Sequence, residues 1–302
     1  MSFTSTVKNE VSKLDTIETE RISELSAIIR NIGTIDHTIK ITSENVSVTR
    51  RIYNLIQDLY HVTPGITVRR GFNFHKNYIY ILEISNKMDI ILNDLSLTTN
   101  IPKNYILDDQ ELTKAYLRGL FLAVGSINDP KKSRYHLEFL VNDFEYAEFV
   151  SKLLNQFELN SKVIKRETKY MIYIKEADKI GDFLKLIHAK QALFYYEDIR
   201  IYRDHKNMTN RLNNCEQANV DKSISTANKQ LKDIEKIMQI GGLDLLDEKT
   251  KVAATYRLKY KESSLLELSE IISIETGNKI TKSGLHHRFK KISDLADKIN
   301  GQ

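Results

Sequence analysis

A short basic segment near the end of the chain carries the residue types that could recognise a polyanion. No acidic residue occurs between Glu275 and Asp294. Leu285, Phe289 and Ile292 recur at helical spacing, which leaves the polar side chains on the opposite face. A helix face without acids can neutralise phosphates and enter the DNA major groove. We therefore predict DNA contacts from Thr281, Lys282, Ser283, His286, His287, Arg288, Lys290 and Lys291.

The residue types divide these contacts into two roles. Ser283, His286 and His287 are candidates to read base edges, whereas the lysines and Arg288 are candidates for phosphate contacts. Thr281 is a good helix N-cap, because its hydroxyl can accept a backbone N–H. The alternative is a helical hairpin with a solvated lysine face. The two adjacent histidines are not expected to hold a metal, since neighbouring residues on a helix point in different directions.

A second group of basic residues lies in the first 190 residues. Two clusters occupy corresponding places in two expected hairpins, and a third follows an apolar segment that ends at Gly125. Alternation along a strand would put only some of these side chains on one face, and a solvated basic strand face is the alternative. The candidate saddle contacts to DNA are Arg69, Arg70, Lys131, Lys132, Arg134, Lys162, Lys165 and Arg166.

The elements that position these groups begin with an internal repeat at an offset of 92 residues. The segment "IIRNIGTI" (28–35) lies on "LFLAVGSI" (120–127), so Gly33 lies on Gly125. Each segment closes a pattern of apolar residues three and four positions apart, which predicts a helix. We expect each glycine to end its helix in a left-handed conformation, which is cheap only without a Cβ.

The same order of elements follows each glycine. Alternating residues predict strands, helical spacing returns, and a hairpin and a short amphipathic helix complete the unit. The hairpins are expected to turn around residues 75–77 and 167–169. The order is therefore helix-strand-strand-helix-strand-strand-helix, twice, over about residues 18–97 and 110–189. Neither half could cover both faces of its sheet alone, so pairing the halves would bury the two repeated helices.

The C-terminal third of the chain has a different pattern. A long helix leaves the repeat, and residues 214–225 then lose apolar periodicity and are interpreted as a hinge. The pair Gly241-Gly242 follows a helical segment rather than a strand, so it is expected to cap that helix and not to bind phosphate. Residues 264–299 contain two helices around a Gly-Asn turn, which is the pattern of a helix-turn-helix.

The bulk composition restricts the class of protein. The chain has 302 residues, a net charge of +5 and a pI near 8.9, which permits a nucleic-acid partner. A single cysteine, Cys215, excludes an internal disulfide framework and a multi-cysteine metal site. No apolar run approaches the roughly 18 residues of a spanning helix, and the N-terminus lacks the layout of a signal peptide. We expect a cytoplasmic protein with no cofactor and no bound metal.

The repeated segments resemble the two motifs of the LAGLIDADG homing endonuclease fold. The nine-residue motif corresponds to Leu25–Gly33 and Leu117–Gly125. The resemblance implies that the two motif helices pack side by side on a pseudo-twofold axis and that two sheets form a saddle over DNA. The small residues Ala27 and Gly119 stand where that family needs the helices to approach closely.

The acids that the resemblance would require for DNA cleavage are missing. In that family the last acid of each motif holds Mg²⁺, and Ile32 and Val124 stand at those positions here. Metal-assisted hydrolysis depends on positioned oxygen ligands, so we predict no catalytic residue and no enzymatic activity. The preceding acid positions hold Arg30 and Leu122. The next acids downstream, which we expect in solvated turns, are Asp36 and Asp129.

The combination of a degenerate two-motif domain, a linker and a C-terminal helix-turn-helix resembles the WhiA family of bacterial sporulation and cell-division regulators. The segments "AYLRGLFLAVGSINDP" and "ITKSGLHHRFKKI" are typical of that family, and the resemblance covers nearly the whole chain. It implies a DNA-binding transcription factor without nuclease activity. Because the composition indicates a reduced, AT-rich genome, the regulated targets are expected to differ from sporulation genes.

We predict an α+β protein in three parts: a two-repeat LAGLIDADG-like saddle domain (1–205), a linker (206–225) and an all-α helix-turn-helix domain (226–302). The predicted function is a nucleoid-associated transcription regulator that binds double-stranded DNA at promoter regions. RNA polymerase or another regulator is a further candidate partner, and no membrane is expected. The alternatives are an active endonuclease and a small-ligand sensor that uses the groove between the repeats.

Overall fold

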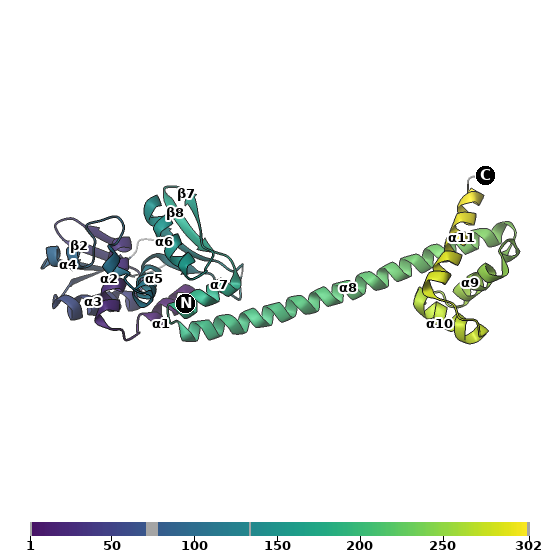
Figure 1. The fold of residues 1–302 in the computed structure, drawn as a ribbon, viewed down its shortest axis with the longest axis horizontal. Helices are drawn as coiled ribbons and strands as arrows, with labels where there is room; N and C mark the ends of the chain where they lie inside the picture. Colours follow the sequence, from purple (N-terminus) through teal and green to yellow (C-terminus); the bar gives the residue numbers. More distant parts are fainter. Residues whose placement is uncertain (1, 71–77, 133, 301–302) are drawn as a thin grey trace. The chain divides into compact units, whose positions relative to one another are not determined.

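Two compact units divide the chain, Met1–Arg203 and Asp204–Gln302. The computed structural model describes residues 2–70, 78–132 and 134–300. The described residues combine helices with two four-stranded antiparallel sheets, both in the first unit, which confirms the predicted α+β class (Figure 1).

The first unit contains the predicted order of seven elements twice (Figure 1). The turn of the second hairpin falls where it was expected, whereas the expected turn at residues 75–77 lies outside the described residues. The first copy comprises α2 (Glu18–Ile32), β1 (Gly33–Ile35), β2 (Ile39–Ser43), α3 (Val46–Tyr60), β3 (Gly65–Arg70), β4 (Tyr78–Ile84) and α4 (Met88–Asp94). The second comprises α5 (Gln110–Val124), β5 (Gly125–Ile127), β6 (Leu137–Val141), α6 (Phe144–Gln156), β7 (Lys162–Arg166), β8 (Lys169–Ile174) and α7 (Ala177–Leu186). The remaining elements of this part are α1 (Phe3–Val11) and η1 (Asn104–Ile106).

The two sheets share one topology, with strand orders β1-β2-β4-β3 and β5-β6-β8-β7. Ile41 pairs with Leu82 in the first sheet, and Phe139 pairs with Ile172 in the second. All four side chains are buried in the core of the unit, where α3 and α6 pack on the sheets. Since side chains alternate along a strand, the residues between these belong to the opposite side, which we call the open face of each sheet.

The two motif helices, α2 and α5, make the closest approach in the unit. A Cβ added to Gly119 would lie 2.2 Å from the carbonyl oxygen of Glu24 and 3.0 Å from Cβ of Ala27. Only a glycine therefore allows the two backbones to come this near. This confirms the predicted role of the small residues, and the helices bury Leu25, Ile28 and Leu117 completely.

The glycines that end the motif helices have a different purpose from the one expected. Gly33 and Gly125 have φ values of −87° and −72°, so neither is left-handed. A Cβ on Gly33 would instead lie 2.4 Å from the carbonyl oxygen of Ile29, and one on Gly125 would lie 2.8 Å from Cα of Phe121. The prediction of a left-handed exit is wrong, because the chain turns directly into a strand against the last helical turn.

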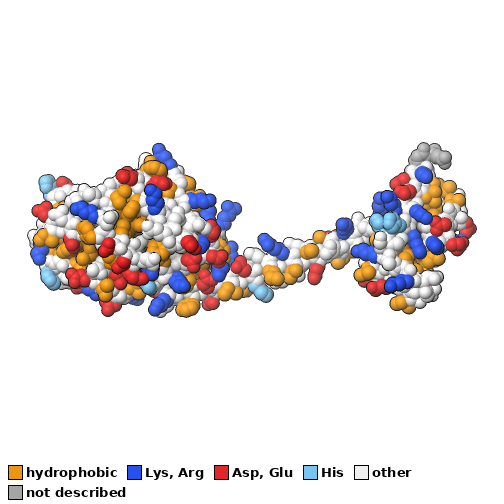
Figure 2. Space-filling view, in the orientation of Figure 1, with side chains coloured by type: hydrophobic (Ala, Val, Ile, Leu, Met, Phe, Trp, Pro, Cys, Tyr) orange, Lys and Arg blue, Asp and Glu red, His pale blue; other side chains and the backbone are white. Residues whose placement is uncertain are grey.

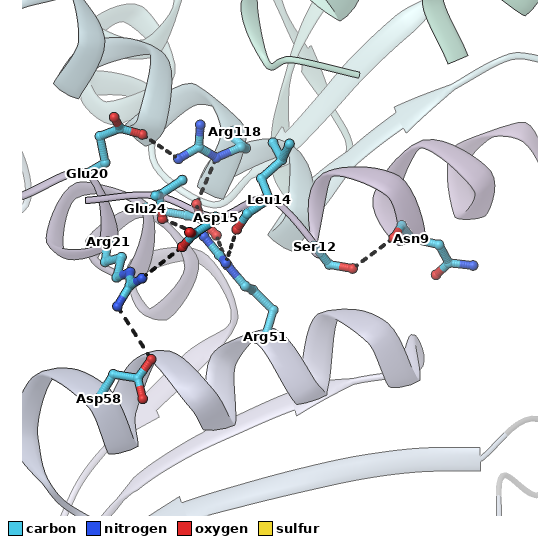
Figure 3. A network of polar contacts seen from close by, with 11 residues as sticks. Asn9, Ser12, Leu14, Asp15, Glu20, Arg21, Glu24, Arg51, Asp58 and Arg118 are labelled. Carbon is cyan, nitrogen blue, oxygen red and sulfur yellow. Dashed lines mark hydrogen bonds and ion pairs between the residues drawn. The ribbon is translucent and has the colours of Figure 1, made fainter. Parts of the chain in front are cut away.

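A buried ionic network ties the two repeats together near the middle of the motif helices (Figure 3). Glu24, fully buried on α2, accepts hydrogen bonds from Arg51 Nε at 2.9 Å and from Arg118 Nε at 2.7 Å. Arg118 is itself buried and forms a second ion pair with Glu20 at 3.3 Å. Arg51 also donates to the carbonyl oxygen of Leu14. The charge of Glu24 is thus matched by guanidinium groups from both repeats.

The helix α8 (Lys190–Ile240) runs without interruption through the expected hinge. Residues 214–225 are helical, so the prediction of a hinge is wrong. The segment contains no glycine or proline, and loss of apolar periodicity reports only that a helix is solvated on all sides. The side chains of residues 206–222 are all exposed to solvent. Contacts such as the 2.9 Å hydrogen bond from Gln217 to Asp221 lie within the helix itself. Among the described residues, no helix is both long and apolar enough to cross a membrane.

The second unit is helical and has its own core. The end of α8 contributes Ile234 and Ile237, which pack with Leu268 and Ile272 and with the last helix. Buried Arg257 donates hydrogen bonds within the unit, and burial lowers the pKa of its guanidinium. After α8 the elements are η2 (Leu243–Leu245), α9 (Glu248–Lys259), α10 (Leu265–Thr276) and α11 (Lys282–Asn300).

Candidate nucleic-acid interface

The turn between α10 and α11 sets the position of the basic helix. Gly277 ends α10 with a φ of 69°, a conformation that suits glycine. The hydroxyl of Ser273 accepts the backbone N–H of Ile280 at 3.0 Å, which fixes the chain before the next helix. Thr281 Oγ1 then accepts the N–H of Gly284 at 3.1 Å, as expected of an N-cap. This confirms the predicted helix-turn-helix connection.

One face of α11 is anchored in the core of the unit. Leu285, Phe289 and Ile292 are buried, as their spacing predicted, and Ala296 continues the same stripe. The Arg257 guanidinium lies 5.5 Å from the centre of the Phe289 ring. Because this face is fixed, the opposite face of α11 has a defined orientation on the surface of the unit.

The exposed face of α11 holds most of the predicted contacts. Figure 2 shows Lys, Arg and His side chains at the surface of the second unit. The rings of the two histidines are tilted at 60° with centroids 6.3 Å apart, so they project separately. Among the described residues, no cluster of histidine, cysteine and acids could hold a metal ion. The exposed predicted contacts are Thr281, Lys282, Ser283, His286, His287, Lys290 and Lys291.

Two predicted contacts have partners on α9. Half-buried Arg288 donates a hydrogen bond to the carbonyl oxygen of Lys249 at 3.1 Å. Lys291 pairs with Asp247 at 3.3 Å. Asp247 is the N-cap of α9, and hydrogen bonds from Thr250 lower the pKa of its carboxyl group. These two basic residues therefore hold α11 against the start of α9, which the sequence did not indicate.

The strands divide the saddle candidates between two faces. Arg69 pairs with Ile79, and Lys162 pairs with Tyr173, so both lie on the open faces. Arg166 shares that face and lies 3.7 Å from Glu138. Acids therefore accompany the basic residues on the open faces. The candidates that alternate to the core side of their sheets, at the edge strands, are Arg70 and Lys165.

The basic cluster that follows the second motif lies elsewhere. Lys131 Nζ lies 5.2 Å from the centre of the Tyr195 ring, on the first part of α8. Lys132 and Arg134 are exposed in the same loop. Asp129 accepts the backbone N–H of Lys131 at 2.9 Å, which confirms its predicted place in a turn. Lys131 is therefore directed toward α8, and the cluster lies in a loop rather than on the edge strands.

The ends of the motif helices border a groove of about 520 Å³ that carries Ile32 and Val124 where the resemblance requires acids. Neither side chain has an oxygen ligand for a cation. The carboxylate that does line the groove is Asp143, which the sequence reasoning missed. It caps α6 through Tyr146 N and accepts a hydrogen bond from Asn100, and this bond holds its pKa low. One oxygen of Asp143, Oδ1, thus accepts both structural hydrogen bonds.

A tyrosine pair closes one wall of this groove. The hydroxyls of Tyr116 and Tyr146 are 2.8 Å apart, and Asn31 donates to Tyr146 at 2.9 Å. Burial raises the pKa of both tyrosines, so both stay neutral at physiological pH. Arg30 donates to carbonyl oxygens of the segment 96–100. The groove offers hydrogen-bonding groups and no array of carboxylates.

The paired αββαββα repeats and the helical C-terminal unit define a class of protein: a LAGLIDADG-like domain joined to a helix-turn-helix domain. Residues 18–98 match the WhiA N-terminal LAGLIDADG-like domain, residues 113–206 the WhiA LAGLIDADG-like domain, and residues 209–296 the WhiA C-terminal HTH domain. The chain belongs to the WhiA family.

Individual relatives extend over the full chain. The protein from Staphylococcus aureus strain JH9 named "Probable cell division protein WhiA" is 43% identical over 314 residues, covering 100% of this chain and 99% of that protein. The crystal structure of full-length DUF199/WhiA from Thermatoga maritima is 28% identical, covers 99% of both chains and has a TM-score of 0.60. The N-terminal LAGLIDADG domain of DUF199/WhiA is 26% identical, covers 62% of this chain and 92% of that one, and has a TM-score of 0.50.

Proposed function

We propose that this protein is a transcription regulator that binds double-stranded DNA at promoters through α11. The observation that carries the proposal is the anchoring of α11: its apolar stripe is buried, while the exposed side of its first part, from Lys282 to Lys291, carries no acid. A helix fixed in this way can enter the major groove with a defined register. The HTH domain of the family to which the chain belongs supports the same use of this helix.

The exposed side chains divide by chemistry. Ser283, His286 and His287 reach base edges, because their short or planar polar groups suit directional hydrogen bonds. Lys282 and Lys290 neutralise phosphates. Arg288 and Lys291 contribute to the positive field while they also hold α11 on α9, a dual role that follows from their contacts with Lys249 and Asp247.

The biological setting of the proposal comes from similarity. Because the Staphylococcus aureus relative is named a probable cell division protein, we propose that the regulated genes include those of cell division. Association with the nucleoid follows from DNA binding. RNA polymerase or a second regulator is the proposed protein partner, since a promoter-bound regulator acts on transcription through such contacts.

A nuclease is the weaker reading of the same fold. Ile32 and Val124 supply no ligand for Mg²⁺, and the nearby Asp143 is engaged as a helix cap. Metal-assisted phosphodiester cleavage needs carboxylates that are free to coordinate the ion. We therefore propose that the first unit binds or positions without cutting.

The experiment is binding and cleavage measured together. End-labelled promoter fragments are mixed with the full chain at several salt concentrations, with and without Mg²⁺, and run on native and denaturing gels. Shifted, uncut DNA whose affinity falls with salt supports the regulator. Strand breaks that need Mg²⁺ would overturn the non-enzymatic proposal, and the absence of any shift on promoter DNA would overturn DNA recognition.

A further inference from the structure

Two grooves lie at corresponding places beside the ends of the motif helices, and Ile32 borders both. The first, of about 520 Å³, lies against the β6–α6 turn and is called the Arg30 groove. The second, of about 460 Å³, lies against the β2–α3 turn and is called the Lys8 groove. The two turns occupy equivalent positions in the two repeats. The grooves therefore share a plan and can be compared group by group.

The Arg30 groove has the two terminal nitrogens of its arginine already engaged by backbone carbonyls. Arg30 donates hydrogen bonds to carbonyl oxygens of the segment 96–100, which lines the groove. The helix cap at the β6–α6 turn is the carboxylate of Asp143. A negative ligand would meet this carboxylate, with Lys169 as the remaining cation in the lining. This groove is therefore poorly suited to an anion.

The Lys8 groove differs at each of these points. Its helix cap is the neutral Asn45, whose side chain accepts from Ser47 N and Val48 N. Its charged lining residues are Lys8 and the exposed Glu44. No carboxylate of the described residues pairs with Lys8, whose ammonium lies 5.8 Å from the centre of the Phe121 ring. The hydroxyl-bearing lining residues are Thr4, Ser5, Thr42 and Ser43, and the apolar side chains of Ile32, Leu122 and Ala123 complete the lining.

Lys8 is held in place by the packing of α1, which lies outside both repeats. Phe3, Val7 and Val11 bury one face of α1 in the core. Thr4 Oγ1 donates to the carbonyl oxygen of Ile127 and accepts its N–H, both at 2.9 Å. These contacts join α1 to β5, so the position of the Lys8 backbone beside the end of α5 is fixed before any ligand arrives.

Burial disfavours the charged, protonated form of Lys8 in this position. Burial lowers its pKa to about 8, from a usual value of 10.5, and no acid offsets that effect. An anion in the groove would supply the missing counter-charge, and the hydroxyls of Ser5 and Thr42 would donate to its oxygens, whereas the Thr4 hydroxyl already donates to Ile127. A tetrahedral oxyanion matches several donors that surround one cation, whereas an apolar ligand would leave them unpaired.

We propose that the Lys8 groove binds a phosphate group, which belongs either to the DNA backbone or to a small phosphate-bearing molecule. The site lies in the first unit and does not depend on α11. It stands next to Ile32, where the resemblance places metal-binding acids. The ammonium of Lys8, carried on a fixed backbone, replaces the metal as the group that faces phosphate, which would retain the anion without activating water.

The test follows the ammonium of Lys8 directly. The full chain is labelled with ¹³Cε-lysine, and the Lys8 resonance is assigned by its loss in Lys8→Arg. The pKa is then measured alone, with inorganic phosphate, and with a promoter duplex. We expect phosphate or duplex to raise the pKa of Lys8 from about 8 toward 10.5. A rise with both ligands indicates the DNA backbone, and a rise with inorganic phosphate alone indicates a small phosphate ligand. No rise with either would overturn the proposal.

Matched variants give a second readout. Lys8→Gln should abolish the effect of inorganic phosphate on neighbouring amide resonances, whereas Lys13→Gln, an equal charge change at an exposed site two residues beyond α1, should leave it unchanged. If DNA is the source, Lys8→Gln should also lower the salt dependence of binding by about 0.9 in log–log slope. A failure of α11 to bind DNA would leave the phosphate arm intact, so the two proposals fail separately.

Discussion

Lys290 and His287 are both exposed on α11, yet the proposal gives them different tasks. A lysine opposite a phosphate acts through charge, which every DNA sequence provides equally. A histidine at a base edge acts through directional hydrogen bonds, which one sequence provides and others do not. The separation of these two effects is the signature expected of a recognition helix.

Lys290→Ala should weaken binding to promoter and unrelated DNA alike and lower the log–log salt slope by about one. His287→Ala should weaken specific binding by about 1–3 kcal/mol and leave unrelated DNA unaffected. Fluorescence anisotropy at four salt concentrations measures both. Lys261→Ala, at an exposed lysine outside α11, is the control. Equal salt slopes for Lys290→Ala and Lys261→Ala would show that Lys290 does not contact DNA phosphates.

Glu24 is the residue on which the buried ionic network depends. Its carboxylate accepts from Arg51 and Arg118 in a fully buried position. Removing one member of such a network leaves buried charge without compensation, which costs about 3–5 kcal/mol. Glu24→Gln should therefore lower the free energy of unfolding of the first unit by that order, as measured by urea titration with circular dichroism. Glu18→Gln, in the exposed first turn of α2, should change it far less.

Lys8 gives the stability of the first unit a defined pH dependence. Its folded-state pKa of about 8 lies below its usual 10.5, so the unfolded chain binds more protons between these values. The contribution of Lys8 to stability therefore rises as pH increases from about 8 to 10.5. Urea titrations in phosphate-free buffer from pH 7 to 10.5 should show a smaller rise for Lys8→Met than for Lys13→Met. Identical profiles would show that Lys8 is not desolvated.

Among the elements of the first unit, the paired motif helices α2 and α5 join the two repeats. Gly119 allows α5 to approach the backbone of α2, where an added Cβ would lie 2.2 Å from the Glu24 carbonyl oxygen. A backbone carbonyl in a packed helix pair cannot move away cheaply. Any residue larger than glycine at position 119 would therefore disturb the pairing of α2 and α5.

Gly119→Ala should separate the motif helices and lower the free energy of unfolding by about 3 kcal/mol or more, as a severe overpacking change does. Gly65→Ala is the control, because a Cβ there would meet its nearest neighbour, Glu83 O, at an ordinary 3.7 Å. Thermal unfolding followed by circular dichroism compares the two. Equal losses of stability would contradict the close contact of the helices.

The sequence predicted most elements because their signals are local. Repeated apolar spacing at an offset of 92 residues located both copies of the repeat, and the spacing of Leu285, Phe289 and Ile292 identified the buried face of α11. The hinge at residues 214–225 was wrong because apolar periodicity reports burial, and a solvated helix has none. A helix that is exposed on all sides therefore shows no apolar periodicity in its sequence, although it is fully helical.

The rest of the site depends on contacts between distant residues. Asp143 approaches Asn100, and Arg288 reaches the carbonyl of Lys249, through tertiary packing that no local pattern encodes. Lys8 was not among the predicted site residues, because only the packing of α1 on the rest of the unit buries its ammonium. Residue types gave the chemistry of the candidates, while their partners required the structure.

At the scale of the whole molecule, the two units divide the proposed work. The first keeps a nuclease-like architecture with Ile32 and Val124 at the motif ends, and the second carries the helix-turn-helix. The family match extends over both units, so the combination is a property of the family rather than a chance fusion. We propose that α11 is the element of the molecule that enters the DNA major groove.

The most direct test places a DNA-cleaving reagent on α11. Exposed Cys215 is first replaced by serine, and an iron chelate is attached to a single cysteine introduced by Ser283→Cys. We expect hydroxyl-radical cuts confined to a few base pairs within the bound promoter site. A second probe, attached through Lys261→Cys, should cut weakly or not at all. Cuts from the second probe without cuts from the first would show that another surface, and not α11, faces the DNA.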